Sequence, residues 1–112
     1  MATIKSYTDL EQSKKLAEIL PLESADMMHD RRIVIPFNDG SLTPCWSLAA
    51  LLKLIPSYII QGEVYFGILD LNECCLKYQT NDGVDLLETK YYDDYIDAAF
   101  EMVVWLKENN KL

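Results

Sequence analysis

The sequence predicts a single α+β domain over residues 1–112, in which three helices pack on a three-stranded antiparallel meander. An extra short strand or hairpin is expected before the second helix. Three observations lead to this prediction. Apolar residues recur at helical spacing near both ends, a nearly uncharged helical segment lies near the middle, and residues 58–90 alternate with a period of two. A length of 112 residues suits one compact domain that folds without metal or disulfides.

The first helix is predicted from a capping signal and from periodicity. Thr8 and Glu11 have the spacing of a capping box, and Pro21 ends the segment. The apolar positions at helical spacing are Leu10, Leu16, Ala17 and Leu20.

The second helix is predicted to begin at Pro44, after a strand and a turn. Residues 27–37 contain a β-branched run that favours a short strand or half of a hairpin, and residues 38–41 are typical of a turn. Thr43 can then cap a helix whose first position is Pro44. This helix, about 44–54, carries one charge and is expected at the centre of the core.

The meander is predicted from three alternating segments, 58–69, 74–79 and 84–90. A hairpin turn at Asn81-Asp82-Gly83 joins the last two. The inward face of the third strand stays open between the pair Val84 and Leu86 and the pair Leu87 and Tyr91. In the first strand one face holds Ile60, Val64, Phe66 and Ile68, and the other holds Gln61, Glu63 and Tyr65.

The last helix, about 94–109, has an apolar surface wider than one stripe. Asp93, Asp94 and Asp97 favour the helix start because carboxylates are stabilised at the positive end of the helix dipole. Residues at 100° intervals leave a narrow polar arc with Val104 at its edge. The apolar surface extends to Ala98, Met102 and Trp105, and we expect the first helix or a second subunit to cover this extension.

Three segments of the chain resemble a group of small uncharacterised proteins from genomes and mobile elements of gut anaerobic bacteria. The resemblance covers somewhat under half the chain, and its most distinctive string is Pro-Cys-Trp-Ser-Leu-Ala-Ala-Leu-Leu. It implies an intracellular accessory protein and carries no catalytic residue, ligand or partner. The segments are residues 10–27, residues 44–52 with Pro56, and Tyr91-Tyr92 leading to Asp97-Ala98 and Glu101-Met102.

The net charge and the length of the apolar runs limit the classes of partner that the sequence allows. Ten basic residues against 18 acids give a net charge of −8, which argues against direct nucleic-acid binding. Residues 70–97 hold eight acids and two lysines, a local charge of −6. Such a surface fits either a solvated acidic face or an acidic inhibitor that mimics nucleic acid and blocks a basic partner. The strongest apolar run, 48–55, is too short to span a membrane, and a cytoplasmic protein is expected.

A thiol enzyme is the third functional alternative. Cys45 falls in the first turn of the predicted second helix, where the dipole stabilises a thiolate, and His29 is the one histidine. The competing interpretation is a small buried thiol that packs in the core, and Cys74 and Cys75 are read as reduced structural thiols. The sequence shows no cofactor motif and no metal-ligand spacing.

Our leading interpretation is a non-enzymatic protein-interaction or regulatory protein. Tyrosine and tryptophan often anchor protein interfaces, and several gather around the last helix. The expected partner is a protein, with a homodimer through the last helix as one form. The predicted contact residues are Tyr91, Tyr92, Tyr95, Ala98, Met102 and Trp105.

Overall fold

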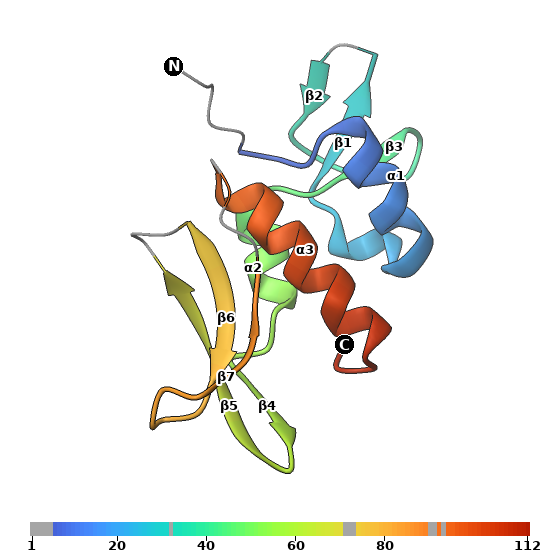
Figure 1. Ribbon diagram of the computed structural model, residues 1–112. Helices are drawn as coiled ribbons and strands as arrows, with labels where there is room; N and C mark the ends of the chain where they lie inside the picture. Colours follow the sequence, from blue (N-terminus) through green and yellow to red (C-terminus); the bar gives the residue numbers. More distant parts are fainter. Residues whose placement is uncertain (1–5, 32, 71–73, 90–91, 93) are drawn as a thin grey trace.

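The computed structural model (Figure 1) describes residues 6–31, 33–70, 74–89, 92 and 94–112, and it is an α+β fold. The described elements are α1 (Leu10–Ile19), a short 3₁₀ helix η1 (Leu22–Ser24), β1 (Met27–Asp30), β2 (Ile33–Ile35), β3 (Thr43–Cys45), α2 (Leu48–Leu54), β4 (Tyr58–Gln61), β5 (Glu63–Asp70), β6 (Cys75–Gln79), β7 (Asp85–Glu88) and α3 (Tyr95–Glu108).

The strands form two antiparallel sheets, so the predicted arrangement of three helices on one three-stranded meander is wrong. One sheet has the order β2-β1-β3, and the other has the order β4-β5-β6-β7. The stretch 58–69 was expected as one strand, but the chain reverses at Gly62, whose φ is +81°. Val64 therefore lies opposite Ile60. The period of two continues across this turn, which is why the alternation did not reveal it.

The second helix begins later than predicted because residues 43–45 form a strand. Pro44 pairs with Met28 of β1, and β3 lies at the edge of its sheet, where a residue without an N–H is tolerated. Ser47 is the N-cap of α2, and its hydroxyl accepts a hydrogen bond from the Ala50 amide at 3.1 Å. Cys45 therefore lies in β3, outside the first turn of a helix.

The cap of α1 is shifted by one residue from the predicted capping box. Asp9 accepts a hydrogen bond from the Gln12 amide at 2.8 Å, and the Gln12 side chain accepts from the Asp9 amide at 3.0 Å. Thr8 is fully buried instead. Leu16 and Leu20 are buried as the periodicity predicts, whereas Leu10 and Ala17 are exposed.

The core lies between α2, α3 and the inner face of the four-stranded sheet, and it continues to Leu16 of α1 and to Trp46. The three-stranded sheet and α1 lie at the other end of the molecule (Figure 1). Asp94 caps α3, which starts where the sequence predicts. The inner face of the sheet is marked by Ile59 and Tyr78, both buried. Leu87 pairs with Tyr78, so Leu87 belongs to the inward face of β7. The buried residues of α3 are Ile96, Ala98, Ala99, Met102, Val103 and Leu106.

The outer face of the four-stranded sheet is exposed. Ile60, Val64 and Phe66 share one face, as their spacing predicts, and this face points away from the core. None of the described helices is long and apolar enough to cross a membrane.

Candidate functional site

The outer side of α3 carries an apolar groove, which we call the α3 groove. Its volume is about 400 Å³. Phe100 and Val104 are one turn apart on this side of the helix, and Trp105 lines the edge of the groove that is opposite Phe100. The groove is lined by Lys15, Tyr92, Phe100, Glu101, Val104, Trp105 and Glu108.

The groove is held in place by polar contacts at the start of α3. Gln12 of α1 donates a side-chain hydrogen bond to Asp97 at 2.7 Å, which ties the two helices together. Burial raises the pKa of Tyr92, and the nearby carboxylates of Glu101 and Asp97 raise it further. The Tyr92 hydroxyl therefore stays protonated and hydrogen-bonds Glu101 at the groove wall.

The predicted contact residues are divided between the groove and the core. Tyr92 and Trp105 line the α3 groove. Ala98 and Met102 are at most 1% exposed, so they belong to the core and offer no surface to a partner. Tyr95 lies elsewhere, with its hydroxyl donating to the Asp70 carbonyl at 3.3 Å, and Tyr91 lies outside the described residues.

The sequence did not single out two residues of the groove, Phe100 and Val104. By helical spacing Phe100 falls on the apolar face of the last helix, and Val104 falls at the edge of its polar arc. Both are half-buried and face the groove. The sequence signal for this groove was Val104 itself. An apolar side chain at the edge of a polar arc indicates that the outer side of the helix is not wholly polar.

Cys45 lies in a buried polar cluster with Thr8, Ser13 and His29. The Cys45 thiol donates to the Thr8 carbonyl at 3.4 Å, and the Thr8 hydroxyl lies 3.6 Å from the sulfur. His29 Nε2 lies 3.0 Å from both the Thr8 carbonyl oxygen and the Ser13 hydroxyl. The fold thus brings the predicted pair Cys45 and His29 to one carbonyl group.

The chemistry of this cluster favours a neutral, structural thiol. Cys45 is fully buried, and its burial raises the pKa of the thiol, an effect that hydrogen bonds from Thr8 and Ser13 oppose. The Asp26 carboxylate, which is close to His29 in sequence, accepts hydrogen bonds from the amide and the hydroxyl of Ser47 at the start of α2. The helix-start environment that would have lowered the thiol pKa is absent from β3.

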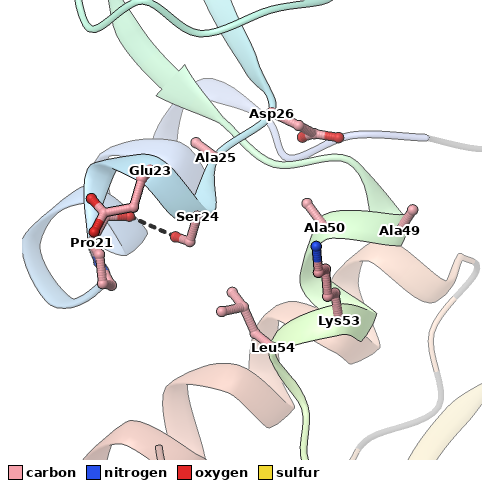
Figure 2. Close-up of a pocket in the computed structure, with 9 residues that line it drawn as sticks. All are labelled: Pro21, Glu23, Ser24, Ala25, Asp26, Ala49, Ala50, Lys53 and Leu54. Atoms are coloured by element: carbon pink, nitrogen blue, oxygen red, sulfur yellow. Dashed lines mark hydrogen bonds between the residues drawn. The ribbon is translucent and has the colours of Figure 1, made fainter.

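A second hollow lies between η1 and α2 (Figure 2), with a volume of about 560 Å³. The polar side chains Ser24 and Asp26 in its wall form hydrogen bonds with other parts of the protein. The Ser24 hydroxyl donates to the Pro21 carbonyl at 2.6 Å and accepts from Trp46 Nε1 at 3.0 Å. Asp26 accepts a hydrogen bond from the amide of Ser47, the N-cap residue of α2, at 2.9 Å. The hollow therefore presents small apolar side chains, with the exposed Glu23 and Lys53 beside them.

Most of the described acids between residues 70 and 97 have structural partners. Asp70 and Glu88 flank Lys77, and Asp85 accepts from the Gln79 side chain at 2.8 Å. Asp94 caps α3, and Asp97 accepts from Gln12. Asp82 lies in an exposed turn, and Glu73 and Asp93 lie outside the described residues.

Within the part of the chain that the structure describes, no cluster of histidine, cysteine and acidic side chains could hold a metal ion. Comparisons with protein-family models, curated proteins and solved structures find no match for this chain.

Proposed function

We propose that the protein is a non-enzymatic interaction protein that binds a protein partner in the α3 groove. The observation that carries this proposal is the groove itself, where Tyr92, Val104 and Trp105 stay accessible although α3 is otherwise the most buried helix. Half-buried aromatic residues around an apolar groove are the usual anchors of a protein interface.

The chemistry of the groove defines the partner segment. Its floor is apolar, and its polar residues are two acids, Glu101 and Glu108, with Lys15 and the Tyr92 hydroxyl. A short amphipathic segment that inserts an apolar side chain and places a basic residue beside Glu108 matches this arrangement. The partner is encountered in the cytosol, a placement that agrees with the reduced thiols of Cys45, Cys74 and Cys75.

The test compares the native protein with Val104→Glu. Val104 lies beside the polar arc of α3, so glutamate is compatible with the helix while it places a charge in the groove. Val84→Glu is the matched control, because Val84 is 58% exposed and lies outside the groove. Each protein is used as bait in lysate of its own host, and the captured partner is then purified and titrated.

We expect the native protein and Val84→Glu to bind the partner equally, and Val104→Glu to bind at least about tenfold more weakly, or about 1.4 kcal/mol. The tryptophan fluorescence reports binding directly, since Trp46 is fully buried and Trp105 lines the groove. Equal binding by Val104→Glu would exclude the groove as the interaction site.

A further inference from the structure

The outer face of the β4–β5 hairpin carries an exposed apolar patch, which we call the hairpin patch. It consists of two cross-strand pairs, Tyr58 with Phe66 and Ile60 with Val64. Their exposed fractions are 54%, 46%, 64% and 41% respectively. The other face of the same hairpin packs on the core through Ile59, so the patch and the core lie on opposite sides of the sheet.

The other half of this outer face is charged and already paired. Lys77 lies 3.6 Å from Asp70 and 3.9 Å from Glu88, and Gln79 hydrogen-bonds Asp85. The outer face therefore has an uncharged part on β4 and the first half of β5, and a part with compensated charges at Asp70, at the end of β5, and on β6 and β7. The four side chains of the hairpin patch carry no charge, and the Lys111 ammonium lies at the edge of the patch, beside the Ile60 carbonyl.

We propose that the hairpin patch packs face to face on the same patch of a second copy of this chain. The exposed surface of its four residues is roughly 400 Å², most of it apolar. A stable interface buries about 800 Å² on each partner, with an apolar centre and a polar rim. The patch has the size of such a centre, and the charged half of the sheet lies where a rim would be.

The lack of charge on the hairpin patch favours a second copy of the chain over a charged partner as the occupant. Each chain carries −8, so two copies repel over most of their surfaces. The uncharged hairpin patch is where like-charged copies can approach closely, and a two-fold axis brings each patch onto itself. A basic partner would gain its attraction from the acidic surfaces and would gain none here.

The geometry favours packing of faces over pairing of strand edges. The ammonium of Lys111 donates to the carbonyl oxygen of Ile60 at 3.2 Å, on the free edge of β4. A lysine over an edge strand discourages another strand from pairing there. Edge pairing would also leave the hairpin patch exposed to water, whereas packing of the two faces buries it.

The test measures the mass of the native protein over a concentration series by sedimentation equilibrium. Ile60→Lys is the test variant, and Ile33→Lys is its control. Both isoleucines lie in edge strands, with 64% and 61% of their surface exposed, and both changes alter the net charge equally. Circular dichroism verifies that each variant is folded.

We expect the native protein and Ile33→Lys to reach twice 12.9 kDa, and Ile60→Lys to dissociate at concentrations at least about tenfold higher. Added salt should strengthen the native dimer, because it screens the repulsion between the two copies. A native protein that stays monomeric, or a dimer that Ile60→Lys leaves unchanged, would overturn the proposal.

The dimer and the α3 groove are tested independently. Val104→Glu should dimerise like the native protein. A Trp105→Glu variant that becomes monomeric, together with an Ile60→Lys variant that stays dimeric, would place self-association on α3 and overturn the proposal for the hairpin patch.

Discussion

Thr8 and Trp46 exchange two hydrogen bonds across 38 positions of sequence. The Thr8 amide donates to the Trp46 carbonyl at 2.9 Å, and the Trp46 amide donates to the Thr8 hydroxyl at 3.1 Å. The same hydroxyl lies 2.8 Å from that of Ser13. One buried threonine therefore joins the entry to α1 with the entry to α2.

Thr8→Val keeps the shape of this side chain but removes its hydroxyl. The Trp46 amide is then buried without a partner, so we expect the free energy of unfolding to fall by about 1–3 kcal/mol. Thr8→Ser keeps the hydroxyl and should lose less than Thr8→Val. Urea unfolding of the three proteins measures the difference. A Thr8→Val protein as stable as the native one would show that these hydrogen bonds contribute little.

Cys45 should resist alkylation in the folded protein near neutral pH. It is fully buried and its thiol pKa is raised, so both access and thiolate formation are suppressed. Cys74 is partly exposed and should react first. Peptide mapping by mass spectrometry after a short iodoacetamide pulse, with and without urea, locates the modified thiols. Rapid modification of Cys45 without urea would revive the thiol-enzyme alternative.

Tyr78 should make the protein less stable at high pH. Its hydroxyl donates to the Pro56 carbonyl at 2.5 Å, and burial raises its pKa from 10.0 to about 12. The unfolded chain loses this proton first, so stability is complete below pH 10 and falls as the pH rises through about 12.

Tyr78→Phe should lower stability near neutral pH, because the hydrogen bond to Pro56 is lost, and should also flatten the alkaline decline. Cys45, Tyr92 and Tyr95 have raised pKa values too, and they stay in the variant, so the difference between the two curves isolates Tyr78. Thermal melts from pH 7 to 12 provide both curves. Parallel curves would contradict this assignment.

Two glycines of the four-stranded sheet should respond differently to alanine. Gly62 has a φ of +81°, and open space surrounds the position of an added Cβ, so Gly62→Ala should cost about 1 kcal/mol through backbone strain alone.

Gly67 does not have a positive φ. A Cβ added there would lie 3.4 Å from Tyr78 Cε1 and from the Pro56 carbonyl oxygen, which is an ordinary van der Waals contact. Because glycine weakens a strand, Gly67→Ala should leave stability unchanged or raise it by about 0.5 kcal/mol. The two melting temperatures compare the variants directly, and a larger loss for Gly67→Ala would reverse this ranking.

Local chemistry determined several elements of this protein. The turn at residues 38–41 has local hydrogen bonds, since Asn38 accepts from the Gly40 amide and Asp39 accepts from the Ser41 amide. The Asn38 side chain also donates to the Leu22 carbonyl, which fixes where the turn lies in the fold. The turn at residues 81–83 likewise relies on the adjacent Thr80, which bonds to Val84 through its backbone and its hydroxyl. Asp94 caps α3 in the same local manner. Such contacts span few residues, so composition and spacing are enough to predict them.

The tertiary structure alone decided whether residues 43–45 form a strand or the first turn of a helix. Thr43 and Pro44 suit a helix start locally, but Pro44 pairs with Met28 and the Trp46 amide bonds to Thr8. Backbone hydrogen bonds to distant segments outweighed the local preference. The same change of element moved Cys45 from an expected thiolate site to a buried neutral one.

The tertiary structure also decided which apolar faces point toward the core and which point toward water. Alternation placed Ile60, Val64 and Phe66 together but could not tell which side of the sheet α3 would cover, because a period of two is symmetric about the strand. Likewise the wide apolar surface of the last helix needed a cover, and the chain itself buries Ala98 and Met102 while leaving Trp105 at the α3 groove. The sequence by itself determined which residues share a face, and only the packing of the elements decided which faces water reaches.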